Sequence, residues 1–356
     1  MRKLIRYFIY TLLLLSAMLL LFLLVMTLLD YKPDTKKLLF VNENSKPIGQ
    51  QDTITVMSWN IGYAGLSVDM DFFYEGGKQV RTSKEQAEIN LREIAGFLER
   101  NDSVDIILIQ EIDRKARRSY NINQLNYISA ILPEHFFYFA KDYDVFFVPL
   151  PISNPMGGAV SGIASLSRFL PSECVQYAYP SQGKWPVSLF QVDNCLIICR
   201  YPLSNGKDLI VINTHNSAYD DGDKRMVEMD YLRRILLVEY NKGNYVVAGG
   251  DWNQIPPLAT SLFQFDKNIN RDYRQYFNPL PIDTGFMPDC WQWISDGKVT
   301  NRFLYEPYKR EQTAETLIDF FLVSPNLSVI DFKTIDLKFK NSDHNPVLIR
   351  FVFNTY

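Results

Sequence analysis

Short apolar runs separated by polar breaks recur along most of this sequence, and they predict a protein rich in β-strands. Runs of this length with many β-branched residues are typical of buried strands. They are bounded by Gly, Pro, Asn and Asp, which are common at turns. The predicted strands lie at residues 53–60, 104–110, 159–167, 187–200, 208–214, 245–250, 317–323, 328–338 and 346–353.

Two stretches have the spacing of amphipathic helices instead. In the first, Ser83 and Gln86 form a capping box, and apolar residues at helical spacing follow through Leu98. The second carries Met226, Met229, Leu232 and Leu236.

Residues 266–313 are rich in Pro, Asn and aromatics and predict a long irregular surface excursion. Because strands outnumber helices, we expect an α/β protein of two packed sheets with helices outside.

The N-terminus contains a membrane-spanning candidate. Residues 7–29 carry no charge and are rich in Leu, and about 20 apolar residues are enough to cross the core of a bilayer. The apolar core of a cleaved secretory signal is usually about 7–15 residues and precedes a small-residue cleavage site. The run here is longer and lacks a clear site of that kind, so we expect a retained anchor, with a cleaved signal as the alternative.

Basic residues predict the orientation of this segment. Arg2, Lys3 and Arg6 precede it, and the positive-inside rule places residues 1–6 in the cytoplasm and the rest of the chain outside. Residues 30–52 are polar, with two prolines and a glycine, and predict a linker. One large domain, residues 53–356, then follows, and we expect it to be monomeric.

Charge and cysteine content exclude some classes of protein. The 37 Lys and Arg face 40 Asp and Glu, and three of the basic residues precede the apolar run, so the domain is acidic rather than basic as a nucleic-acid binder usually is. The four cysteines form no Cys-x-x-Cys, which argues against structural zinc. Cys195 and Cys199 fall in one predicted strand about 13 Å apart, too far for a disulfide, whereas Cys174 could pair with either.

One predicted strand ends in a group that could carry chemistry. Residues 245–250 are followed by Asp251, Trp252 and Asn253, and alternation along an extended chain points the acid and the amide to the same side. A carboxylate that accepts a proton from water, beside an amide that donates to an anion, is a hydrolytic pair. The alternative is an ordinary turn, because Gly, Asp and Asn are all turn residues.

Similar polar residues stand at the ends of other predicted strands, where sites on sheets are commonly built. Each of these residues could instead have a purely structural role, as a turn residue, a solvated loop charge, an ordinary histidine or a turn cap. Asp319 is the hardest to dismiss, because a carboxylate inside an apolar strand is costly to bury without a partner. These further candidates are Asn60, Glu111, His215, Asp319, Asp343 and His344.

Together these segments resemble the endonuclease/exonuclease/phosphatase superfamily, whose motifs occur here in the family order over residues 53–354. The matching segments are Ser58-Trp59-Asn60, Gln110-Glu111, Asn213-Thr214-His215, Gly250-Asp251-Trp252-Asn253, Ile318-Asp319-Phe320 and Ser342-Asp343-His344-Asn345-Pro346. The resemblance implies a four-layer α/β/β/α sandwich and a divalent metal ion, usually Mg²⁺, for which Mn²⁺ can substitute.

The resemblance also implies a role for each site residue. Asn60 and Glu111 would bind the metal, with Asp343 nearby, and Asp251 would orient or deprotonate the attacking water. Asn253 and His215 would contact phosphoryl oxygens, and Asp319 would orient His344. These roles suit the chemistry, because hard cations prefer oxygen ligands and a metal, an imidazolium and an amide can neutralise charge on a transferring phosphoryl group.

We therefore expect a membrane-anchored, metal-dependent phosphoesterase whose substrate is a lipid headgroup, a nucleotide or nucleic acid, or a soluble ester. The segment around Asp319 lacks the pattern of inositol phosphatases. One alternative is a nuclease with the same residues, and a second is a binding module without activity, which would have lost a catalytic position. Phe72, Phe73 and Tyr74 lie in a long loop after Asn60 and either contact substrate or fill a small core.

Overall fold

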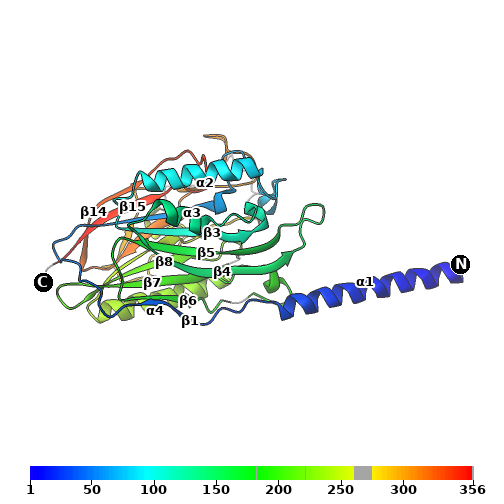
Figure 1. Cartoon of the computed structure of the whole chain (residues 1–356), viewed down its shortest axis with the longest axis horizontal. Helices are drawn as coiled ribbons and strands as arrows, with labels where there is room; N and C mark the ends of the chain where they lie inside the picture. The colour runs from blue at the N-terminus through cyan, green and yellow to red at the C-terminus, as the bar shows by residue number, and fades with distance from the viewer. Residues whose placement is uncertain (182, 221, 260–274, 355–356) are drawn as a thin grey trace.

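The computed structural model describes residues 1–181, 183–220, 222–259 and 275–354, and two sheets packed face to face form its centre (Figure 1). The first sheet has the strand order β1-β6-β7-β8-β9-β13-β10. Its strands are β1 (Lys36–Val41), β6 (Glu173–Ala178), β7 (Cys195–Pro202), β8 (Asp208–His215), β9 (Tyr245–Asp251), β13 (Asp319–Val323) and β10 (Gln292–Ile294).

The second sheet has the order β14-β15-β2-β3-β5-β4. Its strands are β14 (Leu327–Thr334), β15 (Val347–Phe353), β2 (Ile54–Asn60), β3 (Ile106–Ala116), β5 (Gly157–Ser167) and β4 (Phe136–Val148). A separate short pair joins β11 (Asn301–Arg302) to β12 (Glu315–Thr316). Both large sheets are mixed, because β2 runs parallel to β3 and β8 runs parallel to β9 while their other neighbours are antiparallel.

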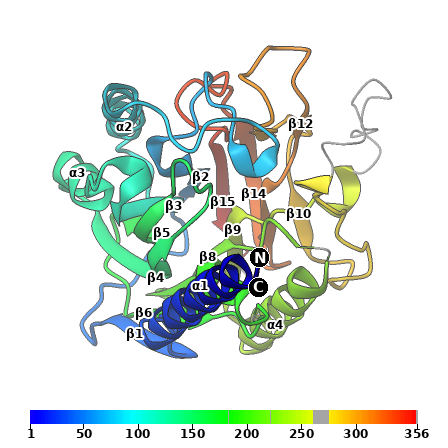
Figure 2. The ribbon, with the colours of Figure 1, turned by 90° about the vertical axis from the view of Figure 1, so that its right-hand side faces the viewer.

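Helices cover the outer faces of the sheets, as Figures 1 and 2 show. They are α2 (Lys84–Glu99), α3 (Gln124–Ile131) and α4 (Asp223–Asn241), together with the 3₁₀ turns η1 (Gly62–Ala64), η2 (Phe73–Glu75), η3 (Arg117–Ser119), η4 (Val187–Phe190) and η5 (Pro257–Ala259). One apolar core lies between the sheets, a second between α4 and the first sheet, and a third beneath α2 and α3. The four-layer α/β/β/α sandwich expected from the sequence is confirmed.

Most predicted elements occur with shifted ends. Ser83 caps α2, since its side chain accepts a hydrogen bond from the backbone N–H of Gln86. The prediction that residues 187–200 form one strand is wrong, because η4 occupies its start and β7 begins at Cys195. Strands β4 and β6 and helix α3 were not predicted. Of the expected excursion at 266–313, residues 266–274 lie outside the described residues, and the remainder contains β10 and β11.

The N-terminal segment has two parts that differ from each other. Helix α1 (Arg2–Leu28) projects from the domain, and by length and composition it can serve as a signal sequence or as a membrane anchor (Figure 1). The expected linker at 30–52 is partly folded onto the domain. Within it, β1 pairs antiparallel with β6 at the edge of the first sheet, and Ile48 is buried in the core between the sheets. The folded unit therefore begins before residue 53.

The edge of the first sheet also contains a disulfide. Cys174 on β6 and Cys199 on β7 occupy paired positions of the two antiparallel strands and are bonded. Cys195 is buried and free, and Cys290 is exposed and free. Of the two pairings that the sequence allows for Cys174, the structure therefore contains the one with Cys199.

Gly250 is required where β9 pairs with Thr214 of β8. Its φ is +152°, and a Cβ atom at this position would overlap the carbonyl oxygen of Thr214 on the neighbouring strand. Gly206, in the turn between β7 and β8, has φ of +76° but no atom within reach of a Cβ. Gly250 is therefore required because a side chain would collide with β8, whereas Gly206 is favoured only because of its backbone conformation.

We predict that Gly250→Ala lowers the free energy of unfolding by roughly 3 kcal/mol or more, because strands β8 and β9 must separate to admit the methyl group. Gly206→Ala should cost only about 1 kcal/mol, the cost of a left-handed conformation for a residue with a side chain. Urea unfolding of both variants in detergent micelles measures the difference. Equal losses for the two variants would contradict this account of Gly250.

Candidate active site

Three predicted site residues lie side by side on adjacent strands of the first sheet. His215 ends β8 and Asp251 ends β9, and the parallel register of these strands pairs the two residues directly. Asp319 begins β13, whose antiparallel register places it opposite Asp251 on the other side. All three side chains are buried. Strand pairing alone therefore arranges an imidazole and two carboxylates in a row.

The second sheet brings Asn60 and Glu111 to the same place. Asn60 ends β2, and its Nδ2 donates to Oε1 of Glu111 at 3.1 Å and to Oδ2 of Asp251 at 2.9 Å. Its Oδ1 accepts from the backbone N–H of Gly62. Glu111 lies at a bulge in β3 with φ of +53°, and this break in register turns its side chain toward the other sheet. Asn60 is thus the amide that joins the two sheets at the site.

Asn253 follows Asp251 in a tight local turn. Its backbone N–H donates to Oδ1 of Asp251 at 2.9 Å, and its side-chain Nδ2 donates to the carbonyl oxygen of Asn216 at 2.8 Å. Its φ is +50°, and Arg225 holds its carbonyl oxygen through a 2.8 Å bond from Nη1. The turn that was the structural alternative is therefore present, and it places the amide in the same pocket as the carboxylate.

The loop before β15 completes the cluster with His344 and Asp343. Nδ1 of His344 shares a hydrogen bond with Oδ2 of Asp319 at 2.8 Å, and its Nε2 lies 3.6 Å from Oδ2 of Asp251. Ser342 secures the loop, because its hydroxyl donates to the carbonyl oxygen of Asn60 and accepts from the N–H of His344. All eight predicted residues are thereby connected through direct contacts, although they come from six separate segments.

The surroundings of His344 hold it in the protonated form. Burial by itself would lower the pKa of His344, but Asp319, Asp343 and Asp251 raise it well above the ordinary value. Burial raises the pKa of Asp319 to about 6, although His344 acts in the opposite direction. Near neutral pH the two side chains therefore form an imidazolium–carboxylate pair, with the second ring nitrogen directed at Asp251.

His215 has a partner that the sequence did not identify. Its Nδ1 lies 3.8 Å from Oδ2 of Asp142 on β4, and its Nε2 lies 3.8 Å from Asp251 and 3.9 Å from Glu111. Burial disfavours the charged ring, but these carboxylates raise the pKa of His215 to about 9. Asp142 is itself buried. The sequence does contain a sign of this partner, because Asp142 is a carboxylate within the apolar run at 136–148. This residue is not selected from the sequence, because no strand is predicted there.

Asn301 is a second contact that the sequence did not suggest. Its side-chain amide lies 2.9 Å from Nε2 of His344, and its Nδ2 donates to the carbonyl oxygen of Asp343 at 3.3 Å. It belongs to β11, inside the region expected to be irregular. No local pattern marked this residue, because its contact depends on how the long segment between β9 and β13 folds back over the site.

The predicted ligand residues fit a hard divalent cation. Asn60, Glu111 and Asp343 offer oxygen atoms, which Mg²⁺ and Mn²⁺ prefer. Asp343 lies against Gly62, whose φ of +49° and missing side chain leave room for the carboxylate. Burial raises the pKa of Asp343 to about 7, and Glu111 adds to the increase while His344 opposes it. The cluster thus holds negative charge that a cation would compensate.

A different trio also lies close enough to hold a metal. Ligand atoms of Asp251, Asp319 and His344 all lie within 4.8 Å of one another. In this trio, however, His344 is bonded to Asp319 and its raised pKa keeps the ring protonated, whereas a histidine ligand must be neutral. The oxygen set is therefore the better candidate on chemical grounds.

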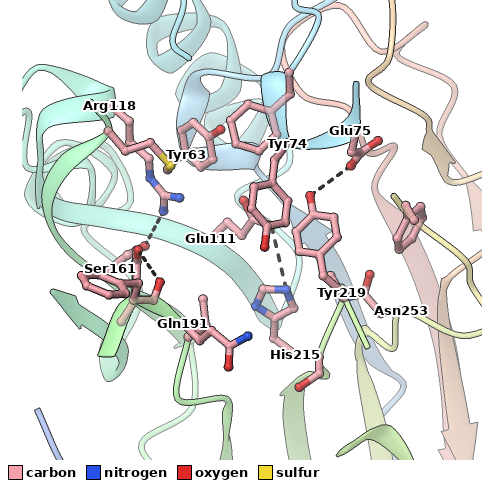
Figure 3. A pocket seen from close by; sticks show the side chains of 18 of the residues that line it. Tyr63, Tyr74, Glu75, Glu111, Arg118, Ser161, Gln191, His215, Tyr219 and Asn253 are labelled. Atoms are coloured by element: carbon pink, nitrogen blue, oxygen red, sulfur yellow. Dashed lines mark hydrogen bonds and ion pairs between the residues drawn. The ribbon is translucent and has the colours of Figure 1, made fainter. Parts of the chain in front are cut away.

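The cluster lies on the floor of a pocket with a volume of about 430 Å³. Figure 3 shows Tyr74 and Tyr219 beside each other above His215. Their ring centroids are 4.7 Å apart, and Tyr219 donates to the buried carboxylate of Glu75 at 3.1 Å. The aromatic residues of the loop after Asn60 therefore pack into a small cluster, and they also line the pocket.

The chain belongs to the endonuclease/exonuclease/phosphatase family. The model described as "Endonuclease/Exonuclease/phosphatase family" matches residues 57–344, a range that includes every predicted site residue. The resemblance seen in the sequence is thereby confirmed, and with it the class of hydrolases that act on phosphoester bonds. No curated protein matches the chain in sequence.

Solved structures share the fold at low identity. An endonuclease/exonuclease/phosphatase from Beutenbergia cavernae is 17% identical with a TM-score of 0.55, over 85% of this chain and 72% of that one. ANGEL2, a 2',3'-cyclic phosphatase, is 15% identical with a TM-score of 0.55, over 89% and 100%. A mannosyl-6-phosphatase from Bacteroides thetaiotaomicron is 15% identical with a TM-score of 0.52, over 84% and 100%.

We predict that Asp319→Asn lowers the pKa of His344, because the amide can still accept a hydrogen bond but carries no charge. His344 has a raised pKa in the folded chain, so its contribution to stability is fully present below about pH 6.5 and is lost as pH rises through the folded value. In the Asp319→Asn variant, the contribution of His344 to stability should be lost at a lower pH than in the wild-type chain.

Histidine NMR can measure this change, because the chain contains only three histidines. His135 is the internal control, since burial lowers its pKa and it lies away from the pocket, bonded to the carbonyl oxygen of Val104. A His344 resonance that titrates at the same pH in wild type and Asp319→Asn would refute the charge pairing.

Proposed function

We propose that this protein hydrolyses a phosphate mono- or diester by in-line attack of water, with a divalent metal ion bound by Asn60, Glu111 and Asp343. The observation that carries the proposal is the contact of a buried Asp251 with both imidazoles and with Asn60, beside the oxygen set. When bound, Mg²⁺ or Mn²⁺ would neutralise charge on the phosphoryl group.

In the proposed reaction, Asp251 orients the attacking water and accepts one of its protons. The water oxygen forms a bond to phosphorus, and the bond between phosphorus and the ester oxygen breaks. The departing oxygen keeps the electron pair and gains a proton from solvent, so charge and atoms balance. Asp251 suits this role because Asn60 fixes its Oδ2 at 2.9 Å and the N–H of Asn253 fixes its Oδ1 at 2.9 Å.

Both histidines would act on the phosphoryl oxygens as cations. The pKa of His215 is raised to about 9 and that of His344 well above its ordinary value, so both rings are protonated near neutral pH. The side chain of Asn253 adds a neutral donor. Preorganised donors of this kind stabilise negative charge as it builds up on a transferring phosphoryl group.

The pocket weakens the proposal of a nuclease. Among the described lining residues, Arg118 is the only arginine and Lys224 the only lysine, and both are engaged: Arg118 pairs with Asp113 at 2.9 Å, and Lys224 donates to Gln191. Single-stranded and duplex nucleic acids are usually held by a basic groove. The related folds bear names for a sugar phosphate and a cyclic nucleotide phosphate, so fold alone does not select a substrate.

We predict that Asp251→Asn and Glu111→Gln each reduce Mg²⁺-dependent release of nitrophenolate from chromogenic phosphate esters by about 10²–10⁴-fold. Asp331→Asn is the matched control, since it makes the same change at an exposed position on β14. A chelator should abolish wild-type activity, and Mg²⁺ or Mn²⁺ should restore it.

Circular dichroism separates lost catalysis from lost folding in these variants. The binding-module alternative is favoured if the folded wild-type chain hydrolyses no phosphoester in a broad screen with either metal. Full activity in Asp251→Asn would exclude the proposed role of this carboxylate, even if the chain proved to be an enzyme.

We further propose that α1 is retained as a membrane anchor, with residues 1–6 in the cytoplasm and the domain outside. Met26, near the end of α1, is buried against the domain, which supports a helix that stays attached. The disulfide between Cys174 and Cys199 supports an oxidising compartment, because such bonds persist mainly outside the cytosol.

Labelling of Cys290 tests this orientation. We predict that a membrane-impermeant maleimide modifies this exposed cysteine in cells whose plasma membrane is intact, because the domain lies outside. In a Cys290→Ser background, Lys3→Cys should be labelled only after permeabilisation. The reverse pattern would invert the orientation, and an N-terminus found by mass spectrometry to begin after residue 29 would show a cleaved signal.

A further inference from the structure

The end of α1 is attached to the domain at the edge of the pocket. The ring of Phe22 stacks on that of Phe190 in η4 at 6.2 Å, and Trp185 donates to the hydroxyl of Thr27 at 3.2 Å. Met26 packs in the same small core as residues of β4 and β5. These contacts fix the direction in which the helix leaves the domain.

Large apolar side chains are exposed around this attachment. Figure 1 shows the hairpin that joins β4 to β5 pointing to the same side as α1, and Figure 2 views the molecule from that side. We define the apolar rim as five residues from this hairpin and from the segment at η4. Their exposed fractions are 64% for Phe146, 54% for Leu150, 87% for Ile152, 62% for Trp185 and 58% for Val187.

The apolar rim continues into the pocket. Leu150 and Val187 belong both to the rim and to the pocket wall. The rest of the pocket wall contains many aliphatic and aromatic side chains. These include Val148, Pro149, Met156, Pro186, Phe190 and Val192. A molecule in the pocket would therefore have its phosphate at the polar floor and an apolar part leading out past the rim.

The depth of the rim follows from the contacts of α1. Phe22 precedes Leu28 by six residues, which corresponds to about 9 Å along a helix. If the apolar run of α1 spans the bilayer core to its end near residue 28, Phe190 lies about that far inside the apolar boundary. Membrane-associated segments commonly bury their apolar face about 5–10 Å into this region, so η4, which contains Val187 of the rim, is at the level of the upper acyl chains.

Scattered exposed apolar residues are normal, but several large ones on two segments that line the same pocket indicate an interaction surface. From these observations we infer that the apolar rim inserts into the bilayer that holds α1, and that the substrate is a membrane amphiphile bearing a phosphoester. Its phosphate reaches the polar floor while its apolar part remains in the bilayer. This inference rests on the proposed function and names the substrate class for it. The direct attachment of α1 beside the rim favours lipid over a protein as the occupant.

A pair of chromogenic diesters with the same leaving group tests the inference: methyl p-nitrophenyl phosphate, which is soluble, and hexadecyl p-nitrophenyl phosphate, which resides in bilayers. The full chain is reconstituted in vesicles of phosphatidylcholine and phosphatidylglycerol with Mg²⁺. We expect the double variant Phe146→Asp/Ile152→Asp to reduce hydrolysis of the hexadecyl ester by about tenfold or more, because two charged side chains cannot enter the apolar layer.

The same variant should hydrolyse the methyl ester at the wild-type rate, since neither side chain lines the pocket and both are exposed. Ile330→Asp is the matched control. It places the same charge at another exposed isoleucine, on β14, and should change neither reaction. For an enzyme that accepts only monoesters, methyl and hexadecyl phosphate replace the pair, with release of inorganic phosphate as the readout.

The outcomes distinguish this inference from the proposed function. If the wild-type chain hydrolyses neither ester of either pair, the proposed function fails. If it hydrolyses the soluble ester, but the rim variant acts on the hexadecyl ester as well as wild type does, the inference is overturned. An equal preference of the wild-type chain for both esters would overturn it as well.

A direct measurement of insertion does not depend on catalysis. In a Cys290→Ser background, an environment-sensitive fluorophore on Ile152→Cys should shift to shorter wavelength in the same vesicles and be quenched by brominated lipid. A fluorophore on Ile330→Cys should keep the emission wavelength typical of an aqueous environment and should not be quenched. A label at 152 that also reports water in the vesicles would overturn the inference and would leave the rim as a surface for a protein partner.

Discussion

A buried carboxylate is the constraint on which the site depends. Asp251 is only 2% exposed, and an isolated carboxylate in such a position would cost several kcal/mol or would take up a proton. Its charge is balanced by Asn60 from one sheet, by His215 from the neighbouring strand and by His344 from the loop before β15. The same contacts therefore also lock the two sheets together at this end.

The backbone at this end departs from regular sheet geometry where chemistry requires it. Glu111 and Asn253 both have positive φ, which is uncommon for residues with side chains and is associated with functional sites. In each case the neighbouring structure holds the conformation: a bulge in β3 for Glu111, and bonds from Asn253 to Asp251 and Asn216. The stability of the sandwich thus supports a local geometry that neither strand would adopt alone.

The helix at the N-terminus and the pocket are also linked through structure. Because the last turns of α1 pack on η4, and η4 forms part of the pocket wall, the direction of the helix fixes the direction in which the pocket opens. An anchor joined by a flexible tether would leave that direction undefined. Here β1 adds to the edge of the first sheet and so shortens the free segment between α1 and the domain. The orientation of the site relative to α1 is therefore defined.

The sequence by itself determined the fold class and the family, and it proposed a set of site residues, because each of these is written in local patterns: apolar runs, glycine pairs, and polar residues at strand ends. Glu111, for example, could be selected from its place after an apolar run. Its positive φ, the partnership of Asp142 with His215, and the contact of Asn301 with His344 were decided only by the tertiary structure. They depend on strand register and on segments more than 40 residues apart meeting in space, and no local pattern encodes which charges a buried histidine will face. The addition of β1 to the sheet was decided in the same way, since a short segment forms an edge strand only when a partner strand offers its free backbone groups.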